Sequence, residues 1–379
     1  MKSIKNGLSK SLKVNKYYNP NTFNAVDSML AYICILLAFF VVGKVLQPCV
    51  DYIVDNRIIK DYFLLEIILA FISQGTIFAV AFVIFKIKKV GYFSGGGYTY
   101  KVNAVDLLMS IMLILSIGLC FSPLHMSFLD DMTGIFGDLG LAIPESAIKD
   151  SNIIFIFIYI FILVPLLPAI FEELLFRGIV MRGMAEKGVA FSIIGSALLF
   201  ATMHGSVGML IVQFFVGLVI AMVVTLTKNH IYGVVMHFVY NFSLSTILSL
   251  PDIAELIAPH LKFTVSAFIT LYGVVFLIIS AFYFFKKFMA KYKAEILGVK
   301  KQKTRFEKRQ TVCYSYVSRC ESEYYLKEYD ELDKNLLKDK NYVFLYKDKF
   351  CKFNKKSNDK LAFTLFSLAL VLSVVLIFI

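Results

Sequence analysis

Charged residues are scarce in this sequence, since Asp, Glu, Lys and Arg make up 17% of its 379 residues. Soluble domains carry about 25%, so the scarcity argues against a soluble globular protein. The sequence also lacks CxxC pairs and an HExxH motif, which are common signatures of redox and zinc sites. No internal repeat of the kind found in many transporters is visible. No cleavable signal peptide is expected, because the first apolar run is long and lacks a small-residue cleavage site.

Long apolar runs are what the sequence has instead. Hydrophobic residues make up 58% of the chain, and the mean hydropathy is +0.73. Runs of about 20 residues, the length that a helix needs to cross a bilayer, recur along it. We therefore predict an all-α, polytopic membrane helix bundle with eight core helices and a ninth at the C-terminal end. The predicted spans are Ser28–Gln47, Tyr62–Phe85, Ala104–Met126, Asn152–Gly183, Val189–Met203, Val207–Thr227, Tyr232–Ser249, Phe263–Phe285 and Leu361–Ile379.

Lysine and arginine concentrate in alternate loops between these spans. The N-terminal arm, the loop after the second span, the turn after the fourth span and the segment before the ninth span are basic, and the intervening loops are acidic or nearly neutral. Basic loops face the cytosol in membrane proteins. We therefore predict a multi-pass protein of the cell membrane, with a cytosolic arm (1–27), an eight-span bundle (28–285), a cytosolic tail (286–360) and a C-terminal anchor (361–379).

The tail carries most of the net charge of +12, because residues 286–360 hold 21 Lys and Arg against 11 Asp and Glu. A basic segment beside a membrane usually meets anionic lipid, at about 1 kcal/mol per well-placed basic residue. Nucleic acid is not expected as a partner, since no recognition motif accompanies the charge. The stretches TVCYSYV and NYVFLYKDKFCKF are rich in Val, Tyr and Phe, which leaves open a small β-containing tail domain.

Ionisable residues within the spans are the strongest functional signal, because each costs roughly 3 kcal/mol on insertion scales. Such residues normally face the bundle interior. We read Glu66 and Gln74 in the second span as helix-contact residues, and we leave out His125, His230 and His260, which lie at predicted span ends or in loops. The candidate site residues in the core spans are Glu172, Glu173, Arg177, His204, His237 and Asn241, together with Phe200, which lies four residues before His204.

The spacing of these candidate residues predicts which of their side chains lie close together. Glu173 and Arg177 are four residues apart, close enough to pair on one helix face, while Glu172 points about 100° away. Glu172 and His204 each lie sixteen residues from Gly188, which is about 24 Å in two helical arms, so they should face each other. His237 lies only about 10 Å into its span. The depth of His237 therefore disagrees with that of Glu172 and His204. Either Pro165 and Pro168 distort the fourth helix, or the turn between the fourth and fifth spans lies elsewhere.

Each element also has a plain structural interpretation. Glu173 and Arg177 could be only an ion pair, His204 could be a buried histidine with satisfied hydrogen bonds, and His237 with Asn241 could bridge two helices. Together, however, a carboxylate, an imidazole at matching depth and a second histidine with an asparagine suffice to activate water and to hold an oxyanion.

Three stretches on the fourth, fifth and seventh predicted helices carry these residues, namely EELLFR, FATMH and HFVYN. In this order they resemble the motifs EExxxR, FxxxH and HxxxN/D of the CPBP intramembrane proteases. That family includes type II CAAX prenyl endopeptidases and bacterial proteins linked to bacteriocin self-immunity. The resemblance covers roughly Ile153 to Ser249 and neither the arm nor the tail.

The resemblance implies an intramembrane endopeptidase. Glu172 and His204 would activate water, His237 and Asn241 would stabilise the tetrahedral intermediate, and Arg177 would hold Glu173. The implied catalytic residues are Glu172, Glu173, His204, His237 and Asn241, with structural support from Arg177 and Phe200.

The metal and the substrate stay open. Glu172, His204 and His237 could ligate Zn²⁺ with a water molecule, but a carboxylate and an imidazole can activate water unaided, and we favour the metal-free reaction. A protein or peptide substrate at the membrane is expected. The Trp-free, Ile-, Phe-, Lys- and Tyr-rich composition is typical of AT-rich bacteria, which lack prenylated CAAX proteins. The competing interpretation is a non-enzymatic membrane protein, such as a transporter, scaffold or immunity protein.

Overall fold

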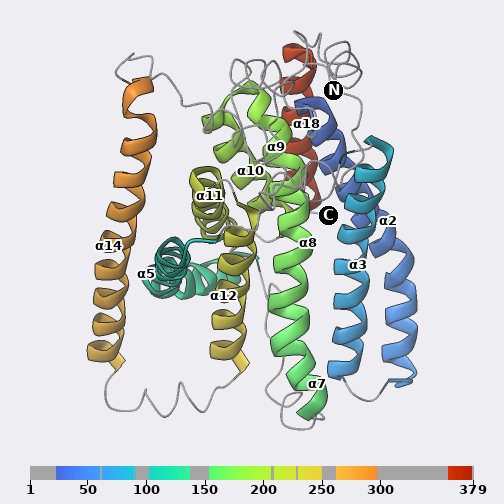
Figure 1. The fold of residues 1–379 in the computed structure, drawn as a ribbon. Helices are drawn as coiled ribbons and strands as arrows, with labels where there is room; N and C mark the ends of the chain where they lie inside the picture. Colours follow the sequence, from blue (N-terminus) through green and yellow to red (C-terminus); the bar gives the residue numbers. More distant parts are fainter. Residues whose placement is uncertain are drawn as a thin grey trace, which may run out of the picture.

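The structure is a computed structural model that describes residues 23–59, 62–88, 90, 102–136, 153–205, 209–227, 229–249, 262–296 and 357–377. All regular secondary structure in these ranges is helical (Figure 1). The prediction of an all-α bundle is therefore confirmed for the part of the chain that the structure describes. The two predicted tail strands, together with Cys313, Cys320 and Cys351, lie outside the described residues.

The helices follow the predicted order, and most extend past the apolar runs into polar ends. The fourth predicted span is one continuous helical arm of six pieces, α7 to η3, in which η1 and η2 are π-helical. The bounds are α2 Ala25–Asp55, α3 Tyr62–Lys88, α5 Ala104–Phe136, α7 Ile153–Phe157, η1 Ile158–Leu166, α8 Leu167–Leu175, η2 Phe176–Val180, α9 Met181–Met184, η3 Ala185–Lys187, α10 Val189–Met203, α11 Leu210–Thr227, α12 His230–Ser249, α14 Lys262–Ile296 and α18 Asp359–Ile377.

Six helices are apolar and long enough in their described residues to cross a membrane. They correspond to α2, α3, the fourth arm, α11, α14 and α18. The predicted spans at α5 and α10 contain shorter apolar stretches, Ala104–Cys120 and Val189–Met203. The protein is therefore a multi-pass membrane protein, and α5, α10 and α12 pack against these six helices to complete the bundle.

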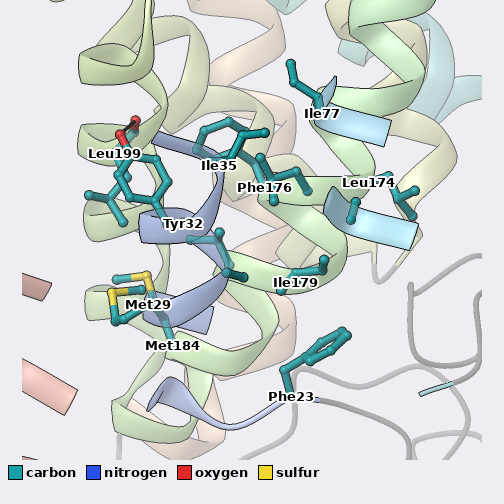
Figure 2. Packing of buried hydrophobic residues seen from close by; sticks show 14 of the residues in the cluster. Phe23, Met29, Tyr32, Ile35, Ile77, Leu174, Phe176, Ile179, Met184 and Leu199 are labelled. Atoms are coloured by element: carbon teal, nitrogen blue, oxygen red, sulfur yellow. Dashed lines mark hydrogen bonds between the residues drawn. The ribbon is translucent and has the colours of Figure 1, made fainter. Parts of the chain in front are cut away.

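The larger hydrophobic core lies where α2, the α8–α9 half of the fourth arm and α10 meet, with α18 packed on α2 and α10 (Figure 2). Phe23, Phe176 and Phe200 are fully buried there. Lipid tails are as apolar as the side chains, so helices in a bilayer associate through close packing and interhelical hydrogen bonds. Tyr32 provides such a bond, because its hydroxyl donates to the Leu199 carbonyl oxygen at 2.8 Å.

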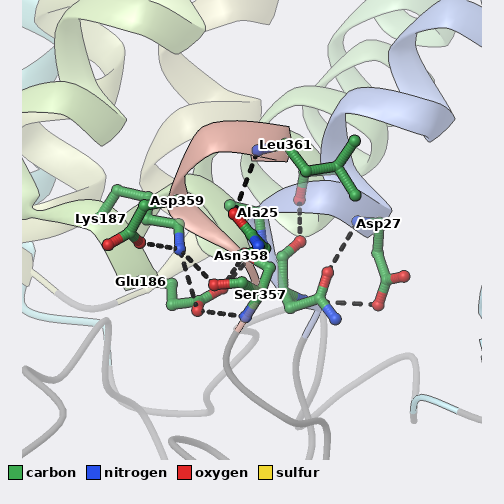
Figure 3. A network of polar contacts seen from close by, with 10 residues as sticks. Ala25, Asp27, Glu186, Lys187, Ser357, Asn358, Asp359 and Leu361 are labelled. Atoms are coloured by element: carbon green, nitrogen blue, oxygen red, sulfur yellow. Dashed lines mark hydrogen bonds and ion pairs between the residues drawn. The ribbon is translucent and has the colours of Figure 1, made fainter. Parts of the chain in front are cut away.

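A polar network joins the turn between η3 and α10 to the starts of α2 and α18 (Figure 3). Glu186 accepts from the backbone N–H of Ala25 at 3.0 Å and from that of Ser357 at 2.6 Å. Lys187 Nζ lies 2.6 Å from Asp359 Oδ1. Three chain segments that the loop charges assign to one side of the membrane therefore meet at one face of the bundle.

We expect this face to be cytosolic, because the predicted basic loops adjoin it. Cys49 is exposed on α2, 24 residues beyond the helix start at this face, so it should be reachable from outside. In single-cysteine variants, an impermeant maleimide applied to intact cells should label Cys49, and it should label Cys351 only after permeabilisation. Cys351 precedes Ser357 by six residues. Labelling of Cys351 in intact cells, with Cys49 protected, would show that the orientation is reversed.

Candidate active site

The candidate site forms where four helical segments approach one another. Helix α8 contributes Glu172 and Glu173, and the next turn, η2, contributes Arg177. His204 ends α10, and His237 lies on α12. All three motifs identified in the sequence therefore contribute to one cluster, which is almost wholly buried.

The structure resolves the mismatch between the predicted depths. The turn lies at Gly188 as predicted, and its φ of +125° is one that glycine adopts readily. A Cβ on Gly178 would lie 3.6 Å from His230 Cε1, so α12 begins level with Gly178. Gly188 lies ten residues further along, about 15 Å at the rise of an α-helix. The hairpin therefore projects beyond the start of α12, and Glu173 and His237 can meet.

The fourth arm is also distorted where the prolines predicted it. Pro165 lies within the π-helical η1, where the N–H of Leu167 bonds to the carbonyl oxygen of Ile162, five residues earlier. A proline has no N–H to donate to the preceding turn. A second π-helical segment, η2, directly follows the two glutamates. Such segments are frequent at functional sites because they rotate the side chains that follow them.

Glu173 and Arg177 form the ion pair that their spacing predicted. Arg177 Nη1 lies 2.6 Å from Glu173 Oε1, and both side chains are almost fully buried. The guanidinium also donates to the carbonyl oxygen of Gly217 at 2.9 Å, and it lies 5.0 Å from the centre of the Phe200 ring. Arg177 therefore links α8, α10 and α11, and the supporting role of Phe200 stays a prediction.

His237 lies between the two glutamates. Its Nδ1 is 3.0 Å from Glu173 Oε1 and its Nε2 is 4.0 Å from Glu172 Oε2. A carboxylate can only accept, so Nδ1 carries a hydrogen toward Glu173. The position of His237 against Glu173 was not expected, because the spacing on the fourth arm had assigned Glu173 to Arg177 alone.

His204 is fixed by the helix that carries it. Its Nδ1 lies 2.8 Å from the carbonyl oxygen of Phe200, which can only accept, so Nδ1 carries a hydrogen. The ring packs against Phe200 with 4.8 Å between centroids. The approach of Glu172 and His204 across the hairpin stays a prediction.

Asn241 does not contact the carboxylates or the imidazoles in this structure. Its Nδ2 donates to the carbonyl oxygen of Val164 at 3.3 Å. In a regular helix that oxygen would accept from residue 168, which is a proline without an N–H. The asparagine therefore satisfies a carbonyl that Pro168 leaves without its usual donor, which is the bridging contact considered in the sequence analysis.

Sequence reasoning missed two residues of this cluster. His230 Nε2 donates to the backbone carbonyl oxygen of Glu173 at 2.8 Å, and Gln74 Nε2 donates to Glu172 Oε1 at 3.3 Å. His230 could have been found, since it precedes His237 by seven residues and so lies on the same face of one helix. Gln74 had been read as a residue that only contacts a neighbouring helix. No pattern in the sequence links it to Glu172.

The proposed metal ligands Glu172, His204 and His237 come together, but they do not form a ligand set. No group of three or more His, Cys, Asp or Glu side chains arranged to hold a metal ion occurs in the described ranges. A catalytic zinc site needs about three such ligands at 2.0–2.2 Å. The donor set in this arrangement does not fit zinc, and we derive no step through it.

Gly233 on α12 leaves space for the carboxylate of Glu173. A Cβ at this position would lie 2.7 Å from Glu173 Oε2 and 2.9 Å from Val224 Cγ2, closer than atoms tolerate. We expect Gly233→Ala to displace the carboxylate and lower the stability by about 1–3 kcal/mol, as overpacking typically does. Peptide cleavage should fall as well. The midpoint of thermal unfolding in detergent measures the first effect.

Gly43→Ala is the matched control, since a Cβ at Gly43 of α2 meets nothing within 4 Å. Alanine is favoured over glycine inside a helix by about 1 kcal/mol, so this variant should be as stable as the parent or slightly more. Equal midpoints of thermal unfolding for Gly233→Ala and Gly43→Ala would show that α12 does not pack closely against Glu173.

Comparison with known protein families supports the motif assignment. Residues 153–243 match the family model described as type II CAAX prenyl endopeptidase Rce1-like. This segment runs from α7 into α12 and includes the whole cluster except Gln74. Neither the curated proteins nor the solved structures gave a match. The match covers 91 of the 379 residues, about a quarter of the chain, and over this segment the protein is similar to the Rce1-like type II CAAX prenyl endopeptidases.

Proposed function

We propose that this protein is an intramembrane endopeptidase that hydrolyses peptide bonds of membrane-associated or CAAX-type prenylated proteins or peptides. The observation that carries the proposal is the environment of Glu172. Its Oε2 is buried without a hydrogen-bond partner among the described residues, and His237 Nε2 lies 4.0 Å from it. An unpartnered carboxylate oxygen is costly in a buried site, and a water molecule about to be activated supplies the donor that it lacks.

Glu172 and His204 act on that water. The Glu172 carboxylate takes a proton from the water while the water oxygen attacks the carbonyl carbon of the scissile bond, which gives a tetrahedral oxyanion. Collapse of the intermediate breaks the C–N bond. The leaving nitrogen recovers the proton from the protonated base, so that one water molecule is consumed and an acid and an amine are released. General bases of this kind contribute about 10²–10⁴-fold.

His237 is suited to hold the oxyanion. Its Nδ1 is engaged with Glu173, so it donates to the oxyanion through a protonated Nε2. Asn241 has two hydrogens on Nδ2, of which one points to Val164 in this structure and the second can complete the oxyanion site. Donors aimed at a developing oxyanion typically contribute about 3 kcal/mol each.

Glu173, Arg177 and His230 hold the site in place in this proposal. Glu173 is held by Arg177 and His237, and its backbone carbonyl by His230. A carboxylate that is already paired makes a poor base, whereas Glu172 on the same helix keeps one oxygen without a partner. We therefore assign the base to Glu172 and a positioning role to Glu173.

The substrate is a protein or peptide already at the membrane, because the site lies among membrane helices. The basic tail would hold anionic lipid at the cytosolic face. A prenyl group and a membrane-spanning peptide would both bring the scissile bond to this depth, and they are the two substrate classes that we propose to compare.

The test uses purified full-length protein in liposomes with three quenched reporters. One is a prenylated CAAX peptide, one is the same peptide without the lipid, and one is a membrane-spanning peptide. We expect cleavage of at least one reporter, and preference for either lipidated or spanning peptide identifies the class. Addition of a zinc chelator decides whether a metal takes part. A correctly folded protein that cleaves none of the three would favour the non-enzymatic interpretation.

A further inference from the structure

Gln74 approaches the proposed base from outside the segment that matches the family. It lies on α3, 98 residues before Glu172, and its Nε2 donates to Glu172 Oε1 at 3.3 Å. Helix α3 is held against α8 at this level, because the ring of Phe78, one turn after Gln74, packs on Phe171 at 4.9 Å between centroids. Gln74 therefore has a defined position beside the reacting groups.

The contact fixes the orientation of the Gln74 amide. An ionised carboxylate has no hydrogen to donate, so only the NH₂ group of the amide can face Glu172. The carbonyl oxygen, Oε1, must then point away from that contact. Gln74 Oε1 is buried and has no hydrogen-bond partner among the described residues. The assignment of the amide nitrogen and oxygen thus follows from hydrogen-bond chemistry, because an ionised carboxylate can only accept.

Two buried acceptors without donors therefore lie on either side of one hydrogen bond, Gln74 Oε1 and Glu172 Oε2. Each unsatisfied buried acceptor costs about 1–3 kcal/mol, and native structures contain few of them. The proposed reaction brings two kinds of donor to this place. The nucleophilic water has O–H groups, and the scissile amide has an N–H group.

We propose that Gln74 Oε1 binds the N–H of the scissile peptide bond while Glu172 Oε2 receives the water. This assignment rests on the proposed function. As the C–N bond breaks, the nitrogen gains the electron pair of that bond and the proton that the base took from water. Gln74 accepts a hydrogen bond from the nitrogen throughout, and the contact strengthens as the nitrogen gains its second hydrogen. Gln74 is therefore a substrate-contacting residue that favours amides over esters.

An ester reporter isolates this contact. Replacing the scissile N–H by oxygen removes the donor and leaves the rest of the substrate unchanged. Purified full-length parent and Gln74→Met proteins in liposomes are compared on the amide and ester forms of the reporter that the parent cleaves. Loss of the Nε2 contact to Glu172 should slow both reactions equally. Loss of Oε1 should lower the amide rate by a further factor of about ten, the effect of one hydrogen bond.

Gln47→Met is the matched control, because Gln47 Nε2 also donates to a carboxylate, Asp51 Oδ1, at 2.9 Å but at an exposed position. It should leave the amide-to-ester ratio at the parental value. Gln74→Asn keeps both amide atoms on a shorter side chain and should retain more of the ratio than Gln74→Met does. Gln74→Leu, which also lacks both amide atoms, serves as the loss variant if the methionine variant fails to fold.

An amide-to-ester ratio that is unchanged in folded Gln74→Met, or in folded Gln74→Leu if the methionine variant does not fold, overturns the assignment while the proposed function stands. A parent protein that hydrolyses neither form of any reporter contradicts the proposed function itself. The ratio therefore separates the two failures.

Discussion

Glu172→Gln is expected to lower kcat for peptide cleavage by about 10²–10⁴-fold, the usual contribution of a general base. Glutamine keeps the size of the side chain and can still accept a hydrogen bond from Gln74, but it cannot take a proton from water. His204→Ala should cause a loss of the same order, because it removes the imidazole predicted to face Glu172 across the hairpin. Cleavage of the preferred reporter by purified protein in liposomes measures both.

Glu186→Gln is the control for this pair of variants. Glu186 is a glutamate on the same arm, but it lies at the turn, where it holds Ala25 and Ser357. Its replacement should lower stability without reducing kcat per folded molecule by more than a few-fold. Unimpaired cleavage by folded Glu172→Gln or His204→Ala would show that the water is activated by other groups.

Arg177→Met and Glu173→Gln are each expected to destabilise the protein by about 3–5 kcal/mol, because each leaves a buried partner without its counter-charge. Arg177→Met should cause the larger destabilisation of the two, because the guanidinium also donates to the Gly217 carbonyl oxygen and faces the Phe200 ring. The effect should appear as a lower midpoint of thermal unfolding in detergent, with a smaller change in kcat per folded molecule.

The double variant Glu173→Gln/Arg177→Met tests the reason for the loss. It removes both charges, so it should be clearly less destabilised than the sum of the two single variants. Lys88→Met provides the comparison, because it breaks the Asp27–Lys88 pair at 2.6 Å, whose lysine is 38% exposed, and it should destabilise the protein less than either buried variant. Additive single effects would contradict this explanation of the loss. An unchanged midpoint with lost activity would make Glu173 a direct participant in the chemistry.

The sequence by itself determined the features that depend on short stretches of chain. Apolar runs predicted the helices, because a bilayer demands about 20 apolar residues for each crossing. The spacing of Glu173 and Arg177 predicted their ion pair, since residues four apart share a helix face. Gly188 was identified as the turn, and the prolines were identified as the place where the fourth arm departs from a regular helix.

Only the tertiary structure decided which of these helices meet and at what level. It places His237 against Glu173, His230 on the Glu173 carbonyl and Gln74 on Glu172. These contacts join residues 57 to 98 positions apart, and they depend on how far the hairpin projects past α12. That displacement arises from the packing of α2, α10 and α18 around the fourth arm, which no local spacing encodes. A polar side chain in an apolar helix predicts a buried partner, but the partner is chosen by the rotation and depth of each helix in the packed bundle.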